Sequence, residues 1–89
     1  MHSVKITRQT TARKLDAYLK GRLKLAALVD WAEDAMCWGE FETRHAASLR
    51  DVVGRLGLAD VRDFSLDWDE CVRLLRRLGY RARVDVARV

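Results

Sequence analysis

Residues 66–86, LDWDECVRLLRRLGYRARVDV, carry the clearest secondary-structure signals in this chain. Asp67 stands three residues before Glu70, so its carboxylate can accept from the free amides of a first helical turn while Glu70 reaches back to the cap amide. Apolar side chains then recur at helical spacing, at Trp68, Cys71, Val72, Leu75 and Leu78. Gly79 follows where a left-handed C-cap is expected. The stretch therefore predicts a capped helix that ends at Gly79.

Beyond this helix the period of the apolar residues changes. From Tyr80 to Val86 they alternate with charged residues, which is the two-residue period of a half-buried strand. Near the N-terminus, Val4 and Ile6 alternate with polar residues in the same way. Because a single strand leaves its backbone groups unpaired, we expect the two terminal segments to pair as a short β-ribbon.

Two helices are predicted in the first half of the chain. The first starts at a Thr7 or Thr10 cap and runs to Lys20. The second spans residues 25–38 and carries an inward apolar stripe of Leu25, Leu28, Val29, Ala32 and Met36. Another side of it carries a second stripe, Ala27, Trp31, Ala35 and Trp38. A helix that is apolar on two sides either is central in the fold or keeps one side for a partner.

A third upstream helix is predicted from about Arg44 to Leu56, after a Thr43 cap. Gly57 follows it as Gly79 follows the last helix, which predicts a similar C-cap. Phe64, in the short connection after that, is expected to plug the core. The predicted fold is thus mainly α: a single helical domain over residues 1–89, built as a compact four-helix bundle with a short two-stranded β-ribbon formed by the N- and C-terminal segments.

Composition and motifs argue against several functional classes. No apolar run approaches the roughly 18 residues of a membrane span, and no secretion signal is recognisable, so we expect a cytoplasmic protein. Cys37 and Cys71 stand far apart and are expected to be small buried side chains in a reducing compartment, since a metal or redox role would need partners beyond His2 and His45. We expect no cofactor, no metal and no catalysis, because no catalytic motif is present and the chain has little room for a substrate pocket.

The net charge of +4 is unevenly distributed along the chain. Residues 1–24 carry +6, residues 25–70 carry −7 and residues 71–89 carry +5. This order either lets the ends of the fold attract its middle or presents a basic face to a nucleic acid or an acidic protein.

Two groups of residues are candidate binding surfaces. The first combines the tryptophans of the second helix with acids on and after it: Asp30, Trp31, Glu33, Asp34, Trp38, Glu40 and Glu42. Tryptophan is enriched where proteins meet, so this group predicts a partner-binding surface. In the alternative interpretation Trp31, Trp38 and Phe41 all fill the core, and the acids are a solvated helix face.

The second group is basic and consists of Arg73, Arg76, Arg77, Arg81 and Arg83. Arginines at this density can contact phosphates or pair with the carboxylates of an acidic protein. The alternative is again an ordinary solvated face.

Two partial resemblances bear on function. The segments FSLD at residues 64–67 and LLRRLGY at residues 74–80, followed by the alternating strand pattern, resemble the C-terminal tail of bacterial helix-turn-helix antitoxins. Between Leu56 and Phe64 the chain departs from that family, because it leaves no room for a recognition helix in the major groove. The segment LDAYLKGR at residues 15–22, followed by an acidic helix, is similar to the start of four-helix bacterial immunity proteins that block colicin-type nucleases, although those proteins are usually acidic overall.

Both resemblances imply a small bacterial protein that acts by occupying another protein. We therefore expect a non-catalytic inhibitor, of the antitoxin, immunity or phage type, that neutralises an effector such as a nuclease by covering its surface. Two alternatives remain open: a small basic nucleic-acid-binding module that uses the arginine group, and an adaptor that forms a homodimer by strand addition at residues 81–86. No membrane partner is expected.

Overall fold

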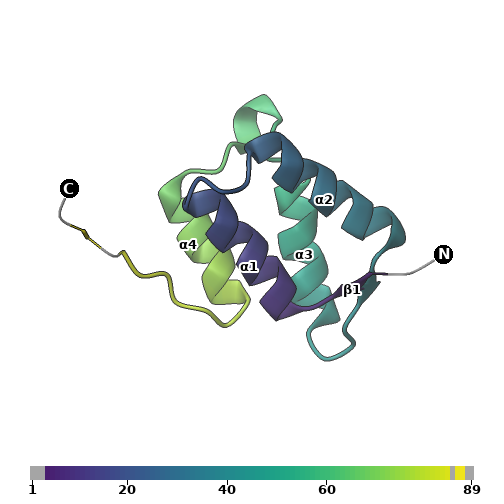
Figure 1. Cartoon of the computed structure of the whole chain (residues 1–89). Helices are drawn as coiled ribbons and strands as arrows, with labels where there is room; N and C mark the ends of the chain where they lie inside the picture. The colour runs from purple at the N-terminus through teal and green to yellow at the C-terminus, as the bar shows by residue number, and fades with distance from the viewer. Residues whose placement is uncertain (1–3, 85, 88–89) are drawn as a thin grey trace.

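Four α-helices, a short 3₁₀-helix and two short strands make up the part of the chain that the structure describes. The structure is a computed structural model, shown in Figure 1, and it describes residues 4–84, 86 and 87. The elements in chain order are β1 (Lys5–Ile6), α1 (Arg8–Leu19), α2 (Leu25–Trp38), β2 (Glu40–Phe41), α3 (Ala46–Leu56), the 3₁₀-helix η1 (Arg62–Phe64) and α4 (Trp68–Arg77). The mainly helical class and the four helices agree with the prediction. In the described residues no helix combines the length and the apolar character needed to cross a membrane.

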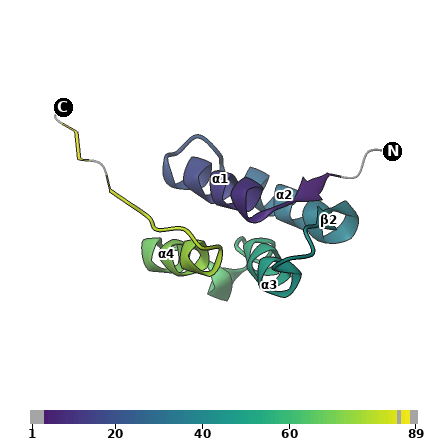
Figure 2. The same ribbon diagram turned by 90° about the horizontal axis from the view of Figure 1, so that it is seen from below.

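The helices lie in two layers, with α1 and α2 above α3 and α4 in Figure 2. Helix α2 packs on α3 and α1 packs on α4, while each layer is also closed by contacts between its own two helices. All four helices contribute to one core between the layers, with residues such as Leu15, Leu28, Leu49, Val52, Leu56, Cys71 and Leu74 almost entirely buried. Most of the predicted apolar stripes turn inward and remove their side chains from water, but Met36 of the α2 stripe and Trp68 of the α4 stripe are exposed, which contradicts the prediction for these two residues.

Helices α1 and α4 begin and end as the sequence predicts. Thr7 caps α1, where its hydroxyl accepts from the Thr10 amide at 3.0 Å and the Thr10 hydroxyl accepts from the Thr7 amide at 2.9 Å. Asp67 caps α4 by accepting from the Glu70 amide at 2.7 Å. At the other end, Gly79 has a φ of +87° and the Tyr80 amide donates to the Leu75 carbonyl at 2.9 Å, which closes a Schellman motif.

Helix α3 ends at Leu56 as predicted, but the predicted Thr43 cap and the left-handed C-cap do not form. It begins at Ala46 rather than near Arg44, and its N-cap is His45, which makes no side-chain cap bond. At its C-terminus Gly57 has a φ of −65°, so the chain continues through right-handed turns rather than through a left-handed cap. A glycine after an apolar helix is thus compatible with either geometry, because glycine permits both signs of φ.

The connection between α3 and α4 is held by Arg55 rather than by a buried Phe64. The Arg55 guanidinium donates to the Phe64 carbonyl at 2.6 Å, lies 5.6 Å from the Phe64 ring centre and pairs with Glu70 at 3.2 Å. Phe64 is 43% exposed, so the expectation that it plugs the core is wrong; Ala59 is the buried residue of this connection. Glu70 serves this ion pair, and no bond from it to the Asp67 cap amide is found among the described residues.

The small sheet differs from the predicted ribbon in its second strand. Strand β1 pairs in parallel with β2, with Lys5 opposite Glu40 and Ile6 opposite Phe41. The C-terminal segment forms no strand over residues 80–84 and leaves the helical body on the side of α1 and α4, far from β1 (Figure 1). The physical reason lies at Gly39, where the chain turns directly after α2 and brings β2 alongside β1. Asp85, which the strand prediction included, lies outside the described residues.

Candidate protein-binding surface

A hollow lies where the end of α2 meets β1. Its volume is about 470 Å³, and its lining consists of Val4, Ile6, Trp31, Asp34, Ala35, Trp38 and Gly39. Trp38, the last residue of α2, is 72% exposed, and Val4 opposite it on the chain entering β1 is also exposed. Large apolar side chains left this open to water at a concave site are typical of a protein-binding surface.

Gly39 makes this geometry possible. A Cβ atom at this position would lie 2.6 Å from the Ala35 carbonyl oxygen and 2.7 Å from Cγ1 of Ile6. The absence of a side chain therefore lets β1 approach the last turn of α2 closely. Trp38, the last residue of α2, therefore lies directly beside the chain that enters β1.

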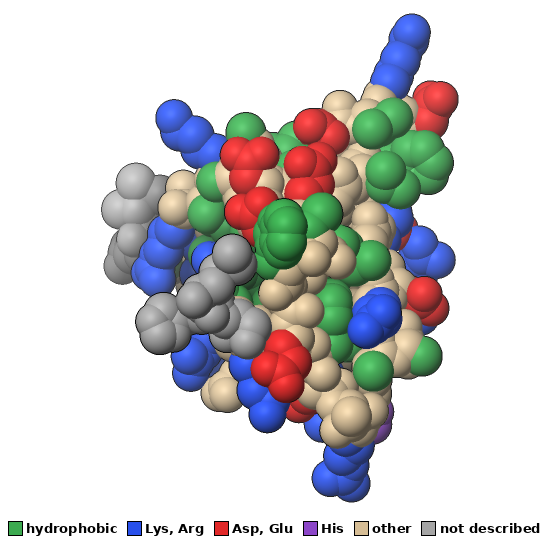
Figure 3. All heavy atoms as spheres, turned by 90° about the vertical axis from the view of Figure 1, so that its right-hand side faces the viewer, with side chains coloured by type: hydrophobic (Ala, Val, Ile, Leu, Met, Phe, Trp, Pro, Cys, Tyr) green, Lys and Arg blue, Asp and Glu red, His purple; other side chains and the backbone are tan. Residues whose placement is uncertain are grey.

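Asp34 is the acid that lines the hollow, and three further acids are exposed on α2 and β2. Asp30, Glu33 and Asp34 are exposed on α2, and Glu40 is exposed on β2. None of the ion pairs found among the described residues involves any of these four carboxylates. Figure 3 shows acidic side chains gathered beside the hydrophobic ones on this face of the molecule. We call the group formed by Val4, Asp30, Trp31, Glu33, Asp34, Trp38 and Glu40 the α2 surface.

Glu42, the remaining acid of the predicted set, is used within the fold. It is half-buried, and its carboxylate accepts from the Arg8 amide at 3.0 Å and lies 3.8 Å from the Arg8 guanidinium. This contact satisfies a free amide at the start of α1 and ties the chain after β2 to that helix. Glu42 is accordingly left out of the α2 surface.

The three aromatic residues of the predicted set have different environments. Trp31 is half-buried, packs against the core and has the Lys14 ammonium 5.7 Å from its ring centre. Phe41 is likewise half-buried, with the Arg50 guanidinium 5.1 Å from its ring centre. Of these three, Trp38 alone is largely exposed, as the partner-binding interpretation expects. Phe41 packs against the core, as the alternative interpretation expects, and Trp31 both packs against the core and lines the hollow.

The five arginines of the basic group do not form one free face. Arg73 is bonded to Glu70 at 2.6 Å, and Arg77 is bonded to Asp51 at 3.2 Å. Arg81 and Arg83 instead line a groove between α1 and α4, together with the aromatic residues Trp68 and Tyr80. Sequence reasoning missed these two rings because it assigned Trp68 to the inner face of α4 and Tyr80 to a strand. The Asp67 cap was the available clue, because it makes Trp68 the first residue of α4, at the end of the helix, where a side chain is less covered than in the middle.

The two cysteines also differ. Cys71 is buried in the core, whereas Cys37 is exposed, which contradicts the expectation that both are buried. Burial raises the pKa of the Cys71 thiol, and the charges of Asp67 and Glu70 raise it further while Arg55 lowers it. Among residues 4–84, 86 and 87, no three or more His, Cys, Asp or Glu side chains are placed to hold a metal ion.

No protein-family model matches this chain, and neither the curated proteins nor the solved structures include a significant match to it.

Proposed function

We propose that this protein is a non-catalytic cytoplasmic inhibitor that binds another protein through the α2 surface. Its class would be that of an antitoxin, an immunity protein or a phage-type inhibitor, and its target a bacterial effector with a basic surface, such as a nuclease. The observation that carries the proposal is Trp38, an exposed aromatic side chain at the edge of a hollow whose lining carboxylate, Asp34, has no ion-pair partner among the described residues.

Each part of the surface has a separate role in this proposal. Trp38 and the hollow beside it supply the apolar contact, and a tryptophan buried at the centre of an interface typically contributes about 2 kcal/mol or more to binding. Asp30, Glu33, Asp34 and Glu40 supply negative charge at positions that can replace the phosphates bound by a cationic effector. Such charges also accelerate association and exclude acidic partners, because like charges repel across an interface.

The rigid placement of these residues favours binding over rearrangement. Trp31 packs against the core, and Trp38 is the last residue of the same helix. The partner therefore meets a surface that is already ordered, which lowers the entropic cost of association. Cytoplasmic localisation belongs to the same proposal, since antitoxins and immunity proteins of this kind meet their targets inside the producing cell.

Quantitative capture from an extract of the source cells tests this proposal. Wild-type protein, Trp38→Ala and Asp34→Lys would be immobilised, and retained proteins would be identified and then purified for titration. Phe64→Ala and Asp63→Lys are matched controls, because these residues are also exposed but belong to η1, which does not line the hollow. We expect a partner that wild type and both controls retain and that Trp38→Ala and Asp34→Lys bind at least about tenfold more weakly.

Circular dichroism separates loss of binding from loss of fold. Trp38→Ala is expected to keep the helical spectrum of wild type, since the side chain removed is mostly in water. A Trp38→Ala protein that unfolds would assign this residue to the core. A folded variant that retains every partner as wild type does would exclude the α2 surface as the binding site.

A further inference from the structure

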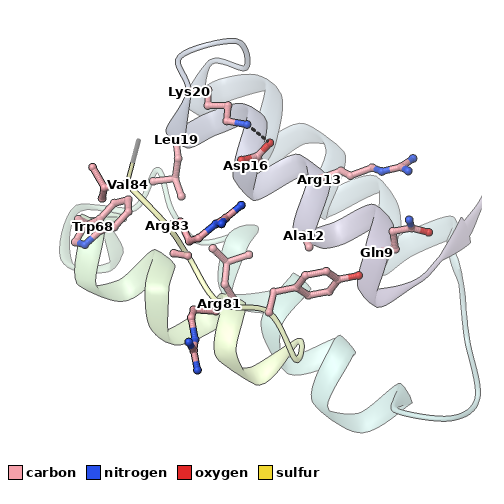
Figure 4. Close-up of a pocket in the computed structure, with 13 residues that line it drawn as sticks. Gln9, Ala12, Arg13, Asp16, Leu19, Lys20, Trp68, Arg81, Arg83 and Val84 are labelled. Carbon is pink, nitrogen blue, oxygen red and sulfur yellow. Dashed lines mark hydrogen bonds and ion pairs between the residues drawn. The ribbon is translucent and has the colours of Figure 1, made fainter. Parts of the chain in front are cut away.

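A second groove lies on the other side of the molecule, between α1 and α4, with the chain after α4 as one wall (Figure 4). Its volume is about 600 Å³. Four of its lining residues are cations, namely Arg13, Lys20, Arg81 and Arg83. The acid in its lining, Asp16, already pairs with Lys20 at 3.1 Å. The groove therefore carries an excess of positive charge and attracts an anionic ligand.

One end of the groove is apolar. Figure 4 shows Trp68, Leu19 and Val84 close together at this end, with the Arg83 side chain reaching from the C-terminal segment toward α1. Trp68 is 45% exposed and Val84 is 67% exposed, so a ligand side chain placed there would remove apolar surface from water. Figure 4 shows the Arg81 side chain directed away from α1, so Arg83 is the cation that extends across the groove beside this apolar end.

The backbone of the C-terminal segment is the third feature of the groove. The Tyr80 amide is used by the helix cap, but within the described part of the chain no backbone hydrogen bond to residues 81–84 is found. Ala82 holds this segment against the core, with Arg81 and Arg83 on either side of it in the sequence. A held segment with free amides and carbonyls beside a groove is suited to β-addition, in which an extended peptide pairs with it as a strand.

We propose that this groove binds an extended acidic peptide segment of a partner protein, which pairs with residues 81–84 as an added strand. Its acidic side chains lie against Arg83 and the cations of the groove walls, and an alternating apolar side chain lies against Trp68. The free backbone favours a peptide over a nucleic acid, since a nucleic acid strand has no main chain that pairs with a β-strand. The inference is independent of the α2 surface, which attracts the opposite charge.

Binding of a fluorescein-labelled peptide of alternating Glu and Val, followed by fluorescence anisotropy with the full chain, tests this proposal. We expect saturable binding that Arg83→Glu weakens about tenfold or more, because charge reversal replaces an ion pair by repulsion. Arg62→Glu is the matched control, as Arg62 is an exposed arginine on η1 outside the groove, and Trp38→Ala is a control on the α2 surface. Both are expected to bind the peptide as wild type does.

Two further probes separate strand pairing from simple charge attraction. A Glu–Val peptide methylated on alternate backbone amides keeps its charge but cannot pair, so it is expected to lose binding, and a Lys–Val peptide is expected not to bind. Absence of saturable Glu–Val binding, equal binding by Arg83→Glu, or equal binding of the methylated peptide would each overturn the proposal. Displacement of the peptide by a thymidine oligonucleotide that binds more tightly would instead assign the groove to single-stranded nucleic acid.

Discussion

Arg55 and Glu70 form the most enclosed ion pair found among the described residues. Arg55 lies in α3 and Glu70 lies in the first turn of α4, so the 3.2 Å contact joins two helices. The same guanidinium donates to the Phe64 carbonyl at 2.6 Å and fixes the chain that connects these helices. Arg55 thereby pairs with a carboxylate, donates to a carbonyl and lies over an aromatic ring at the same time.

Replacement of Arg55 by methionine tests how much this residue stabilises the fold. We expect Arg55→Met to lower the free energy of unfolding by about 1–3 kcal/mol, because it leaves the partly buried Glu70 with the exposed Arg73 as its remaining partner and removes the donor to the Phe64 carbonyl. Arg77→Met is the control and should cost less than about 1 kcal/mol, since its ion pair with Asp51 is exposed. Urea unfolding of both variants gives the comparison, and equal losses would contradict it.

Cys71 makes stability depend on pH in the alkaline range. Its raised pKa means that the folded protein holds the thiol proton more tightly than the unfolded chain does. The resulting stabilisation is complete below the ordinary thiol pKa of about 8.5 and is lost as the pH rises through the raised pKa of Cys71. We therefore expect the free-energy difference between wild type and Cys71→Ala to shrink as the pH rises above that value. A difference that stays constant in urea unfolding at each pH would contradict this linkage.

At the scale of elements, a side chain at Gly39 is expected to destabilise the fold, whereas one at Gly54 is expected to stabilise it. At Gly39 a Cβ would lie 2.6 Å from the Ala35 carbonyl oxygen, whereas at Gly54, inside α3, the nearest atom is Cε of Met36 at 3.8 Å. We expect Gly39→Ala to destabilise the protein by about 1–3 kcal/mol through overpacking. Gly54→Ala should stabilise it by about 0.5–1 kcal/mol, because alanine is the better helix former. Thermal unfolding compares the two, and a neutral Gly39→Ala would contradict the close approach of β1 to α2.

Local signals explain which elements could be predicted. The bounds of α2 and the caps of α1 and α4 agree with the sequence analysis, because a helix cap depends on residues within a few positions of each other. The partner of β1 could not be predicted in this way, since pairing depends on where the chain returns after two helices. The pattern of residues 80–86 has the period of a strand, but a strand forms only where a neighbour supplies its hydrogen bonds.

The sequence predicted most residues of the α2 surface but not which of its tryptophans is exposed. The acids Asp30, Glu33 and Asp34 are exposed, as their positions on the polar side of α2 suggest. Spacing alone could not distinguish Trp31 from Trp38, because both belong to one apolar stripe. The difference arises from their neighbours: Lys14 of α1 lies over the Trp31 ring, whereas Trp38, the last residue of the helix, remains in water.

At the scale of the whole molecule, packing of α1 on α4 brings the two basic ends of the chain together around the peptide groove. Three ion pairs join these ends to the acidic middle: Arg8 with Glu42, Arg73 with Glu70, and Arg77 with Asp51. The basic ends of the chain therefore attract its acidic middle within the fold, which is the first of the two interpretations of the charge distribution. The acids of the α2 surface take part in none of the ion pairs found among the described residues, and none of them lines the groove.

The most direct test of the α2 surface is the fluorescence of Trp38 as the captured partner is added. In a Trp31→Phe, Trp68→Phe background Trp38 is the single tryptophan, and its emission in the free protein should be that of an indole in water. We predict a shift to shorter wavelength that saturates at one partner per chain, because binding removes the indole from water. Saturable binding of the partner with unchanged Trp38 emission would contradict the account.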